Sequence, residues 1–136
     1  MIEIKSAIEN AKNVVITTHK SPDGDAIGSS LALYHYLKNK GLKVSVVVPD
    51  AFPSFLNWMD GVNEISYYDS QKNEVEDMMS EADLVFSLDY NALTRIGPLG
   101  DFIKTLDVTK VVIDHHQDPQ DFADFYFVDT DCCSIA

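Results

Sequence analysis

Three apolar runs of the sequence each end in residues that could bind a metal ion. The residue directly after each run is an Asp or a His: NVVITT precedes His19, LVFSL precedes Asp89, and VVI precedes Asp114, His115 and His116. Short apolar runs rich in β-branched residues are typical of buried strands. Because ligands of open α/β sheets bind outside the carboxyl ends of the strands, we expect these residues to meet at one edge of a sheet.

The loop after the first run adds two more carboxylates. Asp23 and Asp25 lie in the string SPDGD, with Gly24 between them and a predicted helix directly after them. Two carboxylates in such a tight turn can point at two different ions. The string alone also has a plainer interpretation, in which Asp25 caps the helix and Asp23 forms the turn.

Together these residues form a set of mixed oxygen and nitrogen donors: Asp23, Asp25, Asp89, Asp114, His19, His115 and His116. Such a mixture suits Mn²⁺ better than a thiolate zinc site, with Mg²⁺, Fe²⁺ or Co²⁺ as alternatives. Two ions roughly 3.5–4 Å apart, bridged by a carboxylate and a hydroxide, would stabilise the attacking and leaving oxygens of a reaction at phosphorus. The pattern therefore indicates a phosphoesterase. Single Asp and His residues at strand ends have ordinary structural explanations, but three adjacent ionisable groups are costly to bury without a charge partner.

The elements that position these residues alternate between strands and helices. We expect strands at 13–18, 43–49, 64–68, 83–88, 110–113 and 125–128. We expect helices at 2–11, 26–39, 53–59, 74–80 and 98–106. Gly41 is predicted to end the second helix, Trp58 to face inward, and His35 to be a surface or packing residue. The strand–helix–strand pattern predicts an α/β fold with a doubly wound, mostly parallel sheet and helices on both faces.

Size, charge and cysteine usage restrict the class of protein. The 136 residues are enough for one domain, and the formal net charge of −12 argues against a basic protein that coats duplex DNA. Cys132 and Cys133 are adjacent and form no CxxC motif, which fits a reducing cytoplasm. We expect a cytoplasmic protein without a signal peptide, because the N-terminus MIEIKSAIENAK has neither an uninterrupted apolar core nor a small-residue cleavage site. We also expect no membrane span, because the apolar runs are far shorter than the roughly 20 residues of a membrane helix.

Three strings carry a family resemblance: THKSPDGDAIGS, SLDYN and VVIDHH. In order and spacing they resemble motifs I, II and III of the DHH phosphoesterase family, and most of all its branch of oligoribonucleases and 3′-phosphoadenosine-5′-phosphate phosphatases. The resemblance implies a hydrolase with two Mn²⁺ ions, or with Mg²⁺ or Co²⁺ in their place. By position, it implies that His19, Asp23, Asp25 and His115 are metal ligands and that Asp89 bridges both ions.

The same resemblance implies roles for two residues of the third motif. His116 would face the scissile phosphate, and Asp114 would fix the tautomer of a histidine. The string Arg95-Ile96-Gly97 is also typical of the family, although we assign it no chemistry. The family's motif IV Asp and its smaller substrate-binding domain are expected after residue 136. Residues 1–136 would then be an incomplete catalytic domain that binds at least one Mn²⁺ but hydrolyses substrate poorly by itself.

The resemblance implies that the substrate is a short single-stranded RNA or a nucleotide bisphosphate. We expect the protein to bind neither duplex DNA nor a membrane. The resemblance is also compatible with a homodimer. Within the family, an exopolyphosphatase-like enzyme or a phosphodiesterase for the products of cyclic dinucleotides is the alternative. A phospho-acceptor receiver domain or an inactive metal-binding module is the alternative from another class. A receiver domain predicts a Lys at a late strand end, where this sequence has Asp114, His115 and His116.

Overall fold

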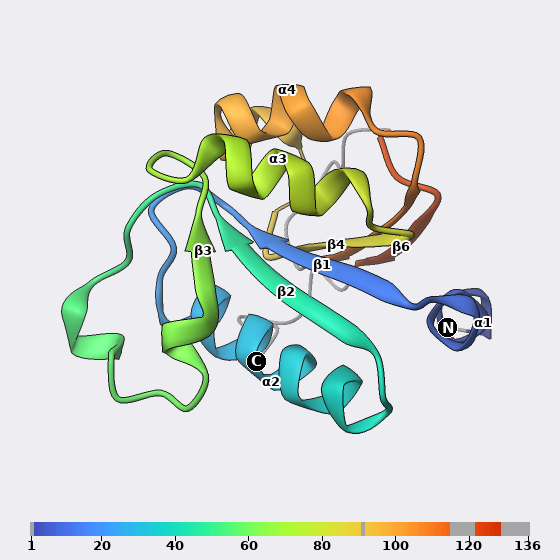
Figure 1. Cartoon of the computed structure of the whole chain (residues 1–136), viewed down its shortest axis with the longest axis horizontal. Helices are drawn as coiled ribbons and strands as arrows, with labels where there is room; N and C mark the ends of the chain where they lie inside the picture. Colours follow the sequence, from blue (N-terminus) through green and yellow to red (C-terminus); the bar gives the residue numbers. More distant parts are fainter. Residues whose placement is uncertain (1, 91, 115–121, 129–136) are drawn as a thin grey trace.

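The apolar runs form one parallel sheet in the computed structural model, which describes residues 2–90, 92–114 and 122–128 (Figure 1). Its strands are β1 (Asn13–Thr18), β2 (Lys43–Val48), β3 (Ile65–Tyr67), β4 (Leu84–Leu88), β5 (Thr109–Asp114) and β6 (Phe125–Val128). Their spatial order is β3-β2-β1-β4-β5-β6, and every neighbouring pair is parallel. The predicted α/β fold class is therefore confirmed.

Helices cover both faces of the sheet, as Figure 1 shows. The α-helices are α1 (Ile2–Asn10), α2 (Gly24–Asn39), α3 (Lys72–Ser80) and α4 (Pro98–Thr105), with shorter 3₁₀ turns η1 (Ser54–Leu56), η2 (Val62–Glu64) and η3 (Leu93–Ile96). One core cluster joins α1 and α2 to one face of the sheet, and a second joins α3 and α4 to the other. Alternate residues of β1 enter the two clusters, which explains why this strand is apolar almost throughout. None of the described helices is long and apolar enough to cross a membrane.

Helix α2 begins two residues before the predicted position because a different aspartate caps it. The Asp23 carboxylate accepts a hydrogen bond from the Ala26 backbone N–H at 3.0 Å, and Asp25 lies in the first helical turn. The expectation that Asp25 could be the cap and Asp23 the turn residue is therefore wrong. At the other end Gly41 follows the helix with a φ of +88°, the left-handed conformation that glycine adopts without steric cost.

The prediction of a helix at 53–59 with Trp58 facing inward is wrong. Only the short turn η1 forms there, and Trp58 is 77% exposed. Leu56 is buried in the core on the α2 side, and Met59, three residues later, packs against the same core. Because residues three apart in a turn share one face, these two side chains take the inward positions and Trp58 points to solvent.

Gly100 lets helix α4 lie directly against η3. A Cβ atom at this position would lie 2.2 Å from the carbonyl oxygen of Leu93 and 3.1 Å from Cγ1 of Ile96. Since the nearest obstacle is backbone, we expect Gly100→Ala to lower the free energy of unfolding by about 1–3 kcal/mol. Denaturant unfolding would show a lower midpoint at unchanged slope.

Gly28 in α2 is the matched control for that change. A Cβ at Gly28 meets no atom within 4 Å. Gly28→Ala should therefore leave stability equal or raise it by up to about 1 kcal/mol, as the helix propensities predict. Equal unfolding midpoints for both alanine variants would contradict the contact between α4 and η3.

Candidate metal centre

The centre lies where the strand order of the sheet reverses. From β1 the chain moves outward through β2 and β3, and it then returns to β4 on the other side of β1. Such a reversal leaves a crevice at the carboxyl ends of the two central strands. His19 follows β1 and Asp89 follows β4, so the fold brings these two side chains together although 70 positions separate them.

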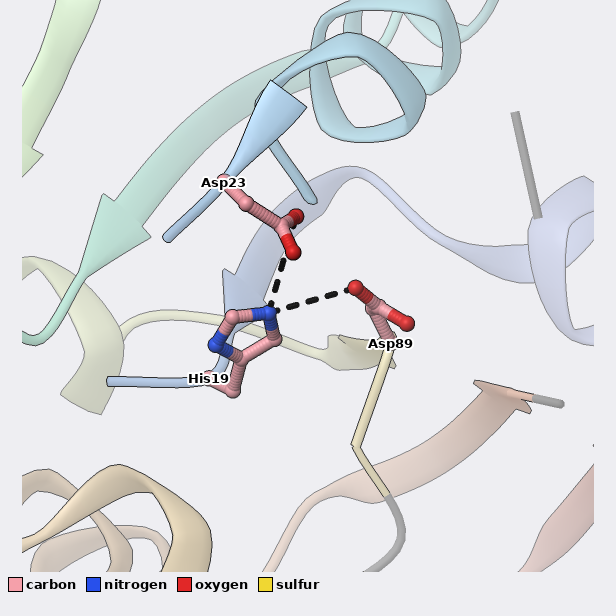
Figure 2. A group of neighbouring side chains, drawn as sticks. All are labelled: His19, Asp23 and Asp89. Atoms are coloured by element: carbon pink, nitrogen blue, oxygen red, sulfur yellow. Dashed lines mark hydrogen bonds and ion pairs between the residues drawn. The ribbon is translucent and has the colours of Figure 1, made fainter. Parts of the chain in front are cut away.

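Figure 2 shows one ring nitrogen of His19, Nε2, facing the carboxylates of both Asp23 and Asp89. Its Nε2 lies 3.2 Å from Oδ2 of Asp89 and 3.8 Å from Oδ1 of Asp23. One ligand atom from each of the three residues falls within 4.8 Å of the others. The side chains of His19 and Asp89 are 12% and 5% exposed, whereas that of Asp23 is 64% exposed. The group is thus open to solvent on the Asp23 side, and one imidazole with two carboxylates is a donor set that fits Mn²⁺ or a related divalent ion.

The surroundings of His19 fix how its ring is oriented. Nδ1 lies 2.7 Å from the carbonyl oxygen of Lys20, which can only accept, so Nδ1 carries a proton and Nε2 faces the carboxylates. The hydrogen bond with Asp89 raises the pKa of His19 above its usual value. The Lys20 carbonyl and the charges of Asp89 and Asp23 act in the same direction, and burial opposes them. A metal ion would take the position of the proton on Nε2.

Asp89 reaches His19 through an unusual backbone conformation. Its φ is +64°, in the left-handed region that costs most residues about 1–2 kcal/mol and that Asn and Asp tolerate best among non-glycine residues. The backbone N–H of Asp89 donates to the carbonyl oxygen of Ile113 at 3.0 Å, which ties the turn to β5. The strand therefore ends in a sharp turn that presents a buried carboxylate to the imidazole, and their hydrogen bond offsets part of the cost of burying the carboxylate.

Asp50 is a structural residue of the site that the sequence analysis missed. Its carboxylate accepts hydrogen bonds from the backbone N–H of Ser21 at 2.6 Å and from the Ser21 hydroxyl at 3.4 Å. Ser21 has a φ of +53° and lies in the loop between His19 and Asp23. The signal was available, because the run KVSVVVPD is another apolar strand followed by a carboxylate. Asp50 orders the loop and lies outside the group of candidate ligands.

The remaining predicted site residues either lie outside the group of three candidate ligands or fall outside the described residues. Asp25, in the first turn of α2, and Asp114, buried at the end of β5, do not join the group formed by His19, Asp23 and Asp89 within the described part of the chain. Both engage in interactions of their own. His115 and His116 lie outside the described residues, as do Cys132, Cys133 and the side chain of Arg95.

The chain is similar to known proteins both in sequence and in structure. Residues 13–136 match the sequence model of the DHH family, N-terminal domain. The bifunctional oligoribonuclease and PAP phosphatase NrnA of Thermus thermophilus is 36% identical over 129 residues, which are 93% of this chain and 34% of that protein. The crystal structure of an exopolyphosphatase-related protein from Bacteroides fragilis has a TM-score of 0.96 at 41% identity and covers 98% of this chain and 39% of that one.

The chain thus spans little more than a third of the length of either relative. A more distant similarity concerns architecture alone. An α-glucosyltransferase in complex with UDP and a 13-mer DNA has a TM-score of 0.62 at 12% identity, covering 86% of this chain and 38% of that chain. At that identity the match shows only the shared arrangement of strands and helices.

Proposed function

Because this chain belongs to the DHH family, we propose that it is the catalytic domain of a manganese-dependent phosphoesterase. The substrates that we propose are short oligoribonucleotides, 3′-phosphoadenosine-5′-phosphate, or both, by analogy with the two activities for which the Thermus thermophilus relative is named. The observation that carries the proposal is the position of His19, Asp23 and Asp89, which meet at the carboxyl ends of β1 and β4.

Divalent ions such as Mn²⁺, held in pairs, supply the positive charge that stabilises attacking and leaving oxygens at phosphorus. His19, Asp23, Asp25 and His115 are the ligands that we propose for two ions, and Asp89 is the carboxylate between them. Asp89 suits this role because its backbone turn and the contact of its Oδ2 with His19 direct its carboxylate toward the other candidate ligands.

We propose that the residues at and directly after the end of β5 contact the phosphate and transfer the proton. Asp114 lies there, fully buried and directly before His115 and His116 in the chain. We propose that His116 contacts the scissile phosphate and hands a proton to the leaving oxygen, while Asp114 accepts a hydrogen bond from a histidine and so fixes its tautomer.

The charge balance of the chain supports a role for metal ions in substrate binding. The formal net charge is −12, and the four aspartates Asp23, Asp25, Asp89 and Asp114 account for four of these charges. Two divalent ions would add +4 and bring the total from −12 to −8. An anionic phosphate substrate would therefore find its positive partner in the metal ions rather than in basic side chains.

The test uses the protein at its full natural length, stripped of metal and assayed with and without Mn²⁺. The substrates are a 5′-phosphorylated RNA dinucleotide, 3′-phosphoadenosine-5′-phosphate and inorganic polyphosphate. We expect hydrolysis of at least one nucleotide substrate, its loss with a chelator and its return with added Mn²⁺. Hydrolysis that survives chelation, or no hydrolysis of any of the three, would refute the proposal.

A second candidate function is hydrolysis of polyphosphate. It is favoured by the 41% identity and near-complete structural match to the exopolyphosphatase-related protein. In the same assay, this function predicts release of inorganic phosphate from polyphosphate at a rate that exceeds turnover of both nucleotides.

A further inference from the structure

A buried tyrosine lies directly beneath the candidate metal centre. Tyr90 follows Asp89 in the chain, and it is the largest of the fully buried side chains among the described residues. Its ring packs in the core that α3 and α4 form with the sheet, and it stacks on Phe122 with ring centroids 6.2 Å apart. Tyr90 is not among the candidate metal ligands.

The hydroxyl of Tyr90 joins the two strands that carry the central ligands. It donates to Ser87 Oγ on β4 at 2.7 Å and lies 2.7 Å from Thr17 Oγ1 on β1. The Thr17 hydroxyl in turn donates to the carbonyl oxygen of Phe86 at 2.7 Å. Burial raises the pKa of Tyr90 to about 12, although the hydrogen bonds to Ser87 and Thr17 act in the opposite direction.

The two hydroxyl partners of Tyr90, Thr17 and Ser87, lie close in sequence to the candidate ligands His19 and Asp89. Thr17 and Ser87 are direct partners in the pairing of β1 with β4. Thr17 lies two residues before His19, and Ser87 lies two residues before Asp89. The hydroxyl cluster thus joins the second-to-last pair of the two strands, one pair before Thr18 and Leu88, with which both strands end.

The same contact closes the turn that contains Asp89. The bond from Tyr90 to Ser87 spans three positions and encloses the left-handed residue Asp89. A left-handed aspartate persists only where its surroundings stabilise that conformation. Here the stabilising contacts are the Tyr90 side chain below the turn and the bond from the Asp89 N–H to Ile113.

From this arrangement we propose that Tyr90 is a positioning residue whose hydroxyl holds the ends of β1 and β4 so that His19 and Asp89 converge on one metal ion. The inference rests on the proposed function, because it assumes that these two residues bind the metal. It adds a residue that contacts neither ion nor substrate and acts through the backbone turn and the paired strand ends.

The test is the affinity of the whole chain for Mn²⁺, measured by isothermal titration calorimetry with Mn²⁺ alone. Tyr90→Phe removes only the hydroxyl and leaves the ring in the core. We expect it to weaken Mn²⁺ binding about 10–100-fold, the range found for groups that orient metal ligands. The midpoint of denaturant unfolding should fall only modestly, because the variant leaves the hydroxyls of Ser87 and Thr17 without this partner but keeps the packed ring.

Tyr68 provides the matched control. It is also buried on the α3 side of the sheet, its hydroxyl donates to Glu76 Oε2 at 2.6 Å, and burial together with Glu76 raises its pKa to about 12. It follows β3, at the edge of the sheet, away from the central strands. Tyr68→Phe should therefore lower stability by a similar amount and leave the Mn²⁺ affinity unchanged.

A second pair of variants covers the case in which Tyr90→Phe does not fold. Thr17→Ser keeps a hydroxyl next to Tyr90, and Thr17→Val replaces it with a methyl group of similar volume. We expect normal Mn²⁺ affinity for the serine variant and weakened affinity for the valine variant.

The possible outcomes separate this inference from the proposed function. Binding of Mn²⁺ by the unaltered chain together with equal affinity of folded Tyr90→Phe would overturn the positioning role alone. If Tyr90→Phe does not fold, equal affinity of both Thr17 variants would overturn it. If the unaltered chain does not bind Mn²⁺, the proposed metal centre itself is wrong, and the role of Tyr90 is excluded with it.

Discussion

Replacement of Asp89 by asparagine is expected to reduce Mn²⁺ affinity by more than about 100-fold, beyond the range found for groups that only support ligands. Hydrolysis by the protein at its full natural length should fall to background. The amide removes the negative charge that we place between two ions, yet it keeps the shape of the side chain. Asparagine also tolerates the left-handed backbone at this position, where φ is +64°. The fold should therefore persist, and the loss can be attributed to the carboxylate.

The choice of asparagine over alanine matters for this experiment. Alanine would add the cost of a left-handed residue without a compensating side chain, about 1–2 kcal/mol, and would mix a folding defect with a binding defect. Calorimetry with Mn²⁺ and thermal unfolding, carried out on the same sample, separate the two effects.

Asp83→Asn is the matched control for Asp89→Asn. Asp83 directly precedes β4, and its carboxylate accepts hydrogen bonds from the backbone N–H groups of Lys12 and Asn13 at 2.9 and 3.2 Å. It therefore lies at the opposite end of the same strand from Asp89. This variant should lose some stability and retain full Mn²⁺ affinity. If Asp89→Asn bound Mn²⁺ as tightly as this control, Asp89 would have to be removed from the ligand set.

Much of the fold could be predicted from the sequence because buried parallel strands have a strong local signal. The runs at 13–18 and 125–128 coincide with β1 and β6, and the other expected strands deviate by one residue at one or both ends. The rule that ligands gather at carboxyl ends of parallel strands was then enough to predict that His19 and Asp89 would lie near each other. Neither step requires knowledge of tertiary contacts.

Details of the site could not be predicted because they depend on backbone geometry and on distant partners. Both Asp23 and Asp25 have the chemistry of a helix cap, and only the path of the loop, tied at Ser21 by Asp50, decides that Asp23 is the cap. The left-handed turn at Asp89 depends on Tyr90 and on a bond to β5. Trp58 was misplaced because an apolar side chain in a short turn gives no sequence signal for its direction.

The position of Asp23 is compatible with two roles, helix cap and metal ligand, and a pair of substitutions can separate them. Its Oδ1 caps α2 through the Ala26 N–H and lies 3.8 Å from His19 Nε2, so a purely structural role and a metal-binding role are both compatible with its position. Serine is as good a helix cap as aspartate but has no carboxylate, whereas alanine supplies neither function.

We expect both Asp23→Ser and Asp23→Ala to weaken Mn²⁺ binding by about 100-fold or more, beyond the effect of groups that only orient ligands. Unfolding should distinguish the two variants, because only alanine loses the cap, at a cost of about 0.5–2 kcal/mol. Calorimetric titration and denaturant unfolding measure the two quantities independently. Normal Mn²⁺ affinity in Asp23→Ser would show that Asp23 is a helix cap alone. The proposed centre would then have to draw its remaining ligands from Asp25 and the residues that follow β5.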